Sequence, residues 1–223
     1  LAPSGADFRA AYDWTQLLFK SGFEEFLKVR LNVYPPFATL ATIPYLAFDF
    51  YTAYIFLIII ILVSLVFSFY LIFQNFLEKK ESSILLSLLL FSSLFLTYPV
   101  QFAVERGNVD ILVGFFSILF FFSYFKNPHS KWPFIFLTLA TQLKVYPLIL
   151  ISFVLLNKNW KFVFKFILVN FCLLFVLGYK SFSKFIWSMY WMSVDPFIFN
   201  VNHSLKSWCM QRFSAEISNQ VYL

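Results

Sequence analysis

Charged residues are scarce in this sequence. Only 13% of its 223 residues are charged, whereas 61% are hydrophobic and the mean hydropathy is +0.76. A soluble domain carries charge on about a quarter of its residues, so this composition indicates an integral membrane protein. Glycine is also rare, with five glycines against 34 phenylalanines, which argues against a disordered or fibrous chain.

Cysteine and histidine are nearly absent, with two of each. Cys172 lies within an apolar run and Cys209 in a polar tail, and the sequence has no CxxC motif and no His/Cys cluster. Neither a disulfide framework nor a zinc site is therefore expected. The sequence also lacks a GxGxxG phosphate loop and a nucleophile elbow, which disfavours a soluble nucleotide-sugar enzyme. We expect no metal and no cofactor.

The net charge of +6 comes from short basic clusters between apolar runs. This pattern is typical of lysines beside a membrane and not of a nucleic-acid-binding surface, so we expect a membrane partner and no nucleic acid. The chain starts at Leu1 instead of Met, and residues 1–34 lack the apolar core of a signal peptide. We therefore expect a fragment, with a single transmembrane domain that is incomplete at both ends.

Apolar runs predict the order of the helices. Residues 8–27 are typical of an amphipathic surface helix, and the prolines of YPPFATLATIP open and then end a short helix. Residues 50–74 are almost uninterruptedly apolar, which is enough to cross a hydrocarbon layer of about 30 Å. Further membrane segments are predicted at 84–104, 109–125 and 162–179. The fold class is an all-α, polytopic transmembrane helix bundle.

Residues 132–156 are flanked by lysines on both sides, by Lys126 and Lys131 before them and by NKNWKFVFK after them. The positive-inside rule places both groups on the cytoplasmic side, so we expect the segment to fold back at Lys144–Pro147. The result is a re-entrant pair of half-helices of about 12 and 10 residues, too short to cross singly. The turn between the half-helices would then lie within the membrane. Non-helical backbone there must be surrounded by protein or must line a water-filled cavity, so the fold-back implies a cavity.

This topology divides the chain into three parts. We expect residues 35–179 to form the membrane helices, and residues 1–34 and 180–223 to form loops that share the extracytoplasmic side.

Lys144 stands alone in the apolar run ATQLKVYPLILI. An unpaired lysine near the centre of a bilayer costs about 2.5 to 3.5 kcal/mol, so it needs a partner or water. Three explanations stay open: the side chain snorkels to an interface, it pairs with Asp110 or Glu105, or it binds an anion such as a phosphate.

The polar turn ERGNVD also has two explanations. Asn108 suits a helix N-cap, Asp110 suits the first helical turn, and Gly107 suits a tight turn. Alternatively, the turn is functional: Arg106 offers a planar fork for a phosphate or a sugar-bearing anion, and Glu105 orients it.

Asp7 and Asp13 are six residues apart, so on one helix they point to different faces and only one is expected to face a site. A carboxylate at the outer membrane surface can act as a general base, although an exposed Asp is more often a cap or a solvated charge. His203 shares the compartment of Asp7 and Arg106 if the fold-back is correct. The aromatic residues Tyr12, Trp14, Tyr34 and Trp208 either stack on sugars or anchor the chain at the interface.

The order of these motifs resembles a known family. DFRAAYDW, YPPF, ERGNVDILVGF, LKVYPLIL, NKNWK and NHSLKSW follow one another as in the polytopic GT-C glycosyltransferases of family 87, which include polyprenyl-phosphate-mannose-dependent mannosyltransferases. The resemblance implies that Asp7 is the general base. It also implies that Gly107–Asn108, Lys144 with Pro147, and Asn202–Ser204 are functional segments, although many relatives have Gln in place of His203.

From this resemblance we expect a membrane glycosyltransferase that moves a hexose, mannose above all, from a polyprenyl-phosphate donor to a lipid or glycan acceptor with inversion. The expected substrate-binding residues are Arg9, Tyr34, Glu105, Arg106, Asn108, Lys144, His203 and Ser204. The expected location is the bacterial plasma membrane, with the active site on the extracytoplasmic face. The alternative is a transporter or flippase of lipid-linked saccharides that performs no chemistry.

Overall fold

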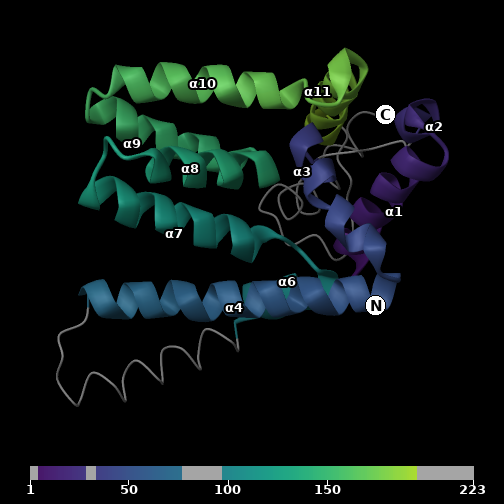
Figure 1. Cartoon of the computed structure of the whole chain (residues 1–223), viewed down its shortest axis with the longest axis horizontal. Coiled ribbons are helices and arrows are strands. Elements are labelled where there is room, and N and C mark those ends of the chain that lie inside the picture. Colours follow the sequence, from purple (N-terminus) through teal and green to yellow (C-terminus); the bar gives the residue numbers. More distant parts are fainter. Residues whose placement is uncertain (1–4, 29–33, 77–96, 195–223) are drawn as a thin grey trace, which may run out of the picture.

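The computed structural model describes residues 5–28, 34–76 and 97–194, and every regular element in these ranges is helical (Figure 1). The predicted all-α class is therefore confirmed. The elements are α1 (Ala6–Lys20), α2 (Phe23–Lys28), α3 (Pro36–Ala41), η1 (Ile43–Ala47), α4 (Phe50–Phe76), α6 (Tyr98–Arg106), α7 (Asp110–Lys126), α8 (Lys131–Leu143), η2 (Tyr146–Leu150), α9 (Ile151–Leu156), α10 (Trp160–Leu174) and α11 (Gly178–Val194).

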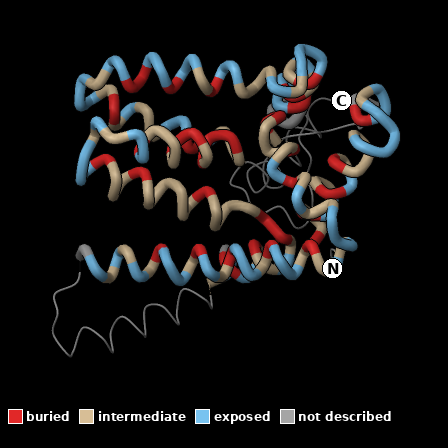
Figure 2. Tube along the Cα trace, viewed as in Figure 1, coloured by how far each residue is buried: buried red, intermediate tan, exposed pale blue. Residues whose placement is uncertain are grey.

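Helix α4 is the predicted first span. Its 27 residues extend over about 40 Å at 1.5 Å per residue, and Phe50–Gln74 has a mean hydropathy of 3.1. Large apolar side chains such as Ile55 and Val63 are exposed along it, and Figure 2 shows exposed positions recurring along α4 and α10. Apolar side chains on the outside of a helix are stable when lipid covers them. Among the described residues, α4 is the one helix long and apolar enough to cross a membrane singly.

Helices α7, α8, α9 and α10 form a layered bundle around one core. Figure 1 shows η2 and α9 running back alongside α8, so the predicted fold-back of residues 132–156 is confirmed. The backbone of Lys144 is extended, with φ −150° and ψ 145°, and Pro147 opens η2, so α8 cannot continue through this point. The buried residues of the core are Phe120, Tyr124, Leu137, Val154, Phe162, Val163 and Phe166.

Lys144 lies beside the start of α7. Helix α7 has 17 residues and α8 has 13, which corresponds to about 25 and 20 Å. Because α8 runs antiparallel to α7 for most of its length, the break after α8 lies level with the first turn of α7. The ammonium of Lys144 is 2.8 Å from the carboxylate of Asp110 in that turn. The lysine therefore lies at the end of the α7–α8 pair, whereas the longer α4 extends beyond this point (Figure 1).

The N-terminal surface helix is present but interrupted. Residues 8–27 were expected as one helix, whereas α1 ends at Lys20 and α2 begins at Phe23, after Gly22 with φ +86°. A second core, formed by Phe8, Tyr12, Ala53, Leu57 and Ile61, joins α1 to α4. The short helix expected from YPPFATLATIP is α3, which ends before Pro44 as predicted, and Pro44 itself lies in the following η1.

The segment expected as a loop from residue 180 begins with a long helix. The chain bends by 102° between α10 and α11, at a turn that ends in Gly178 with φ +82°. Helix α11 then packs against α2 and α3. The predicted span 84–104 lies mostly outside the described residues, and its described end belongs to α6.

The two ends of the bundle differ in chemistry (Figure 1). The α7–α8 and α9–α10 junctions, with Lys126, Lys131, Lys158 and Lys161, lie at one end. Helices α1, α3 and α6 lie at the other, together with the break at Lys144. The basic junctions and the polar turns are therefore separated by the length of the helices.

Candidate functional site

The centre of the candidate site is the carboxylate of Asp7, in the first turn of α1. Arg106 donates to Asp7 Oδ1 from Nε at 3.0 Å and from Nη2 at 2.5 Å. Asn108 donates to the other oxygen, Oδ2, from Nδ2 at 3.1 Å. Asp7 is thus held by the turn between α6 and α7, and its side chain is 20% exposed.

Glycine makes this close approach possible. Gly107 ends α6 with φ +65°, and a Cβ added to it would lie 2.7 Å from Phe8 Cβ. A side chain is therefore excluded both by the backbone conformation and by the packing of α1. At the start of α1, Gly5 N donates to the carbonyl of Glu105 at 2.6 Å. Tyr54 of α4 donates to the carbonyls of Val104 and Glu105, so the end of α6 is fixed from two directions.

Asn108 connects Asp7 to a second charged pair. Its Oδ1 accepts from Lys144 Nζ at 3.0 Å and from the backbone N–H of Asp110 at 3.0 Å. The second bond satisfies the first backbone N–H of α7, whose N-cap residue is Val109 and not Asn108 as expected. Lys144 Nζ lies 2.8 Å from Asp110 Oδ1, and Tyr146 donates to the same oxygen at 3.1 Å. Asn108 is buried, with 7% of its surface exposed, so one amide links two ion pairs.

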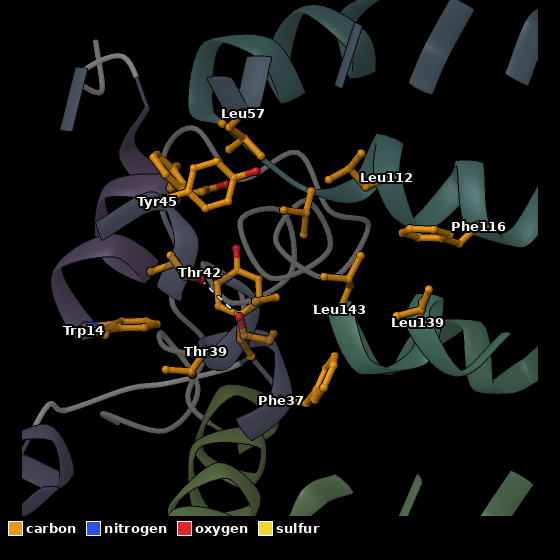
Figure 3. A pocket seen from close by; sticks show the side chains of 18 residues that line it. Trp14, Phe37, Thr39, Thr42, Tyr45, Leu57, Leu112, Phe116, Leu139 and Leu143 are labelled. Atoms are coloured by element: carbon orange, nitrogen blue, oxygen red, sulfur yellow. Dashed lines mark hydrogen bonds between the residues drawn. The ribbon is translucent and has the colours of Figure 1, made fainter. Parts of the chain in front are cut away.

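An apolar cavity of about 240 Å³ opens beside Asp7 (Figure 3). Figure 3 shows aromatic and leucine side chains around it, among them Phe37 from α3, Leu57 from α4, Phe116 from α7 and Leu139 from α8. The remaining lining residues are Asp7, Phe8, Ala11, Trp14, Tyr34, Ala38, Thr39, Ala41, Thr42, Tyr45, Gly107, Val109, Leu112 and Leu143. Apart from Asp7, this lining carries no charge.

A second, more polar cavity of about 450 Å³ also borders Asp7. Its lining comprises Asp7, Ala10, Trp14, Tyr34, Asn108, Lys144, Val145, Tyr146 and Met189. Asp7, Trp14 and Tyr34 line both cavities. An apolar space and a polar space therefore meet at one carboxylate, an arrangement that suits an amphiphilic molecule.

Tyr34 is a hydroxyl donor at this boundary. Burial, and then the negative charges of Asp7 and Asp110, raise the pKa of its phenol above the ordinary value. The phenol therefore stays protonated at neutral pH. The ring of Trp14 lies against it, with centroids 6.5 Å apart, so an aromatic surface and an O–H group face the cavities together. Tyr12, in contrast, is buried in the second core and donates to the carbonyl of Phe48.

The structure brings together some of the expected site residues and separates others. Asp7, Tyr34, Asn108 and Lys144 line the polar cavity. Arg106 lines neither cavity, and its guanidinium is bonded to Asp7. Of the alternatives for Lys144, the contacts favour the pair with Asp110. Asn202, His203, Ser204 and Trp208 lie outside the described residues.

The contacts of two further expected site residues do not support the roles predicted for them. Arg9 was expected to bind substrate, but it lies on the outer face of α1, where it pairs with Asp13 at 3.5 Å and stacks over Phe50. Its distance from the site follows from helix periodicity, because residues two positions apart point in different directions. The carboxylate of Glu105 was expected to orient Arg106, but Asp7 does so, and Glu105 contributes its backbone carbonyl.

Three polar residues with structural partners were not predicted from the sequence. Tyr146 donates a hydrogen bond to Asp110. Its position next to Pro147, where the helix is broken, could have indicated from the sequence that it lies at the site. Gln142, 1% exposed, donates from Nε2 to Asn170 Oδ1 at 3.0 Å and so links α8 to α10. No sequence signal pairs these two amides, since they are 28 positions apart. In the described part of the chain, no group of acidic, His or Cys residues could hold a metal ion.

Comparison with protein-family profiles matches residues 32–214 to Glycosyltransferase family 87. Comparisons with curated proteins and with solved structures give no match. The family match covers most of the chain, including Asn108 and Lys144, whereas Asp7 precedes it. Together with the apolar helices, this match identifies the chain as a member of glycosyltransferase family 87, a membrane glycosyltransferase.

Proposed function

We propose that the protein transfers a sugar, mannose, from a polyprenyl-phosphate donor to a hydroxyl group of a lipid or glycan acceptor, with inversion at the anomeric carbon. The observation that carries this proposal is the position of Asp7 at the junction of an apolar and a polar cavity. A donor of this kind has a long apolar chain, a charged phosphate and a sugar. The apolar chain matches the apolar cavity, and the phosphate and sugar match the more polar one.

Asp7 is suited to be the general base. A carboxylate can accept about four hydrogen bonds, and Arg106 and Asn108 use three of these positions, one of which is on Oδ2. Oδ2 therefore keeps room to accept from an acceptor hydroxyl. Because Arg106 and Asn108 fix the carboxylate, it is oriented before the acceptor arrives, which lowers the entropic cost of the reaction.

Lys144 is suited to bind the donor phosphate. Its ammonium has three N–H donors, and Asn108 and Asp110 accept two of them. In the reaction, the acceptor oxygen attacks the anomeric carbon and its proton passes to Asp7. The bond between that carbon and the phosphate oxygen breaks, and the phosphate leaves with the electron pair. Lys144 then stabilises the charge that develops on the phosphate.

Attack with inversion needs the base and the leaving group on opposite faces of the sugar. We assign these two roles to Asp7 and Lys144, which are separate groups joined through the amide of Asn108. The aromatic surface of Trp14 and the hydroxyl of Tyr34 border the same space and are suited to contact a sugar face.

The test is sugar transfer by membranes that contain the full-length protein, supplied with radiolabelled polyprenyl-phosphate mannose. Product formation distinguishes an enzyme from a carrier of lipid-linked saccharides. Asp7→Asn is expected to abolish transfer while donor binding persists, because the amide keeps the shape but cannot take a proton. Asp13→Asn, an exposed change on the same helix, is the control. Undiminished turnover in Asp7→Asn would refute the assignment.

We also propose that the site faces the extracytoplasmic side of a bacterial plasma membrane. The lysine-bearing junctions at the opposite end of the bundle support this orientation. In a background without Cys172 and Cys209, Glu25→Cys in α2 should react with an impermeant thiol reagent on intact cells. His129→Cys, at the α7–α8 junction, should react only after permeabilisation. The opposite pattern, or labelling of both from outside, would reverse the proposal.

A further inference from the structure

Two hydrogen-bond donors of the polar cavity converge on one oxygen of Asp110. Lys144 Nζ lies 2.8 Å from Asp110 Oδ1, and the hydroxyl of Tyr146 lies 3.1 Å from the same atom. Lys144 and Tyr146 both line the polar cavity. A phosphate oxygen that entered this cavity would be bound by the same two donors. Asp110 Oδ1 therefore occupies a position that suits a phosphate oxygen.

The charges of the site are balanced without any ligand. Arg106 and Asp7 form one pair, and Lys144 and Asp110 form the other. The four formal charges sum to zero. An anionic ligand that reached Lys144 would meet the negative charge of Asp110 at close range, and like charges in contact repel each other.

The two acidic residues are held differently. Asp7 is 20% exposed and accepts three hydrogen bonds from Arg106 and Asn108. The side chain of Asp110 is 46% exposed, so water can replace the contacts that it would lose on turning outward. Lys144 is 23% exposed and is also held by Asn108. Asp110 is consequently the more exchangeable partner of its pair.

We propose that the carboxylate of Asp110 is an internal anion that competes with the phosphate group of the substrate for Lys144 and Tyr146. This inference rests on the proposed function, because it assigns the phosphate to the same cavity. When the phosphate binds, Asp110 turns to solvent. When the lipid phosphate has lost its sugar, the return of Asp110 to Lys144 favours its release. Asp110 thereby weakens phosphate binding and prevents the product from remaining bound.

The proposal predicts a gain in affinity from a loss of charge. Asp110→Asn keeps the size of the side chain and removes the competing anion. We expect the dissociation constant of the purified full-length protein for farnesyl phosphate, measured by calorimetry, to fall about tenfold. Asp13→Asn removes one negative charge from the exposed face of α1 and should leave the constant unchanged. Lys144→Gln should weaken binding in either background.

Transfer kinetics give a second readout. In Asp110→Asn, the KM for the donor and kcat should both fall, because the product leaves more slowly. Asp110→Ser serves as an independent variant, and thermal unfolding of each variant shows whether it is folded. Inorganic phosphate is titrated in parallel. Tighter binding of both phosphates supports the inference, whereas tighter binding of inorganic phosphate alone overturns the assignment of a lipid phosphate.

The outcomes separate the two proposals. If folded Asp110→Asn and Asp110→Ser bind farnesyl phosphate no more tightly than the unmodified protein, the inference is wrong, although Asp7→Asn still abolishes transfer. If the unmodified protein transfers no sugar and Lys144→Gln leaves phosphate binding unchanged, the proposed function fails as well.

Discussion

The side chain of Asn108 donates to Asp7 Oδ2 at 3.1 Å, although the two residues are 101 positions apart. Through its other atom, Oδ1, the same amide accepts from Lys144. One buried side chain thus sets the positions of the base and of the cation that we assign to the phosphate. The geometry of the site therefore depends on the turn that carries Asn108.

Gly107→Ala should destabilise the protein and reduce transfer. The new Cβ would lie 2.7 Å from Phe8 Cβ, and the residue has φ +65°. The cost is expected to be about 2 kcal/mol or more, because strain and a clash add. Gly22→Ala is the control, since Gly22 has φ +86° but no atom within 4 Å of the added Cβ. The measurement is the thermal unfolding temperature in detergent, and equal temperatures for the two variants would contradict the prediction.

Arg106→Lys should lower kcat/KM for sugar transfer while the protein stays folded. Arginine donates to Asp7 Oδ1 from two nitrogens, and a lysine cannot reproduce this fork. The carboxylate is then less well oriented, and a loss of roughly 10- to 100-fold is expected. Arg9→Lys is the matched change, because its ion pair is exposed and such pairs contribute little. If the two variants were equally active, Arg106 would not be needed to position Asp7.

Filling the apolar cavity should impair the use of lipid donors. Ala38 of α3 lines this cavity, so Ala38→Phe would occupy part of its volume of about 240 Å³. We expect kcat/KM to fall at least about tenfold, which corresponds to ~1.4 kcal/mol, for long-chain polyprenyl donors. The affinity for inorganic phosphate should not change. Ala47→Phe, on the exposed side of η1, is the control, and full activity of Ala38→Phe with long-chain donors would show that the chain lies elsewhere.

The amide pair between α8 and α10 gives a prediction about stability. Gln142→Leu leaves the buried side-chain oxygen of Asn170 without the amide that donates to it, which should cost about 1–2 kcal/mol. Replacing both amides by leucine removes both polar groups, so the double variant should be less destabilised than the sum of the single ones. Ser152→Ala on the exposed face of α9 is the control. Simple additivity in thermal unfolding would show that the two amides are not coupled.

Much of the fold could be predicted from the sequence because its signals are local. The apolar run of residues 50–74 specifies α4, and Pro147 after Lys144 ends α8 because proline removes a donor and restricts its neighbour. The lysines on both sides of residues 132–156 predicted that this segment folds back. The bend at Gly178 and the helix after it were missed, since an apolar and aromatic stretch suits a membrane helix and a surface helix alike.

The partners within the site could not be predicted in this way. Periodicity indicated that only one of Asp7 and Asp13 faces a site, but the docking of α1 on α4 decides which one. Because of the same docking, Arg106 pairs with Asp7 and not with Glu105. Likewise, the pairing of Lys144 with Asp110 depends on how far α8 extends alongside α7.

By itself, the sequence determined a helical membrane protein with a broken helix pair, because composition, periodicity and proline act within a few residues. Tertiary structure alone decided that Asp7, Asn108 and Lys144 form one connected site. Their hydrogen bonds join residues 36 and 101 positions apart, and such contacts form only when the helices have packed.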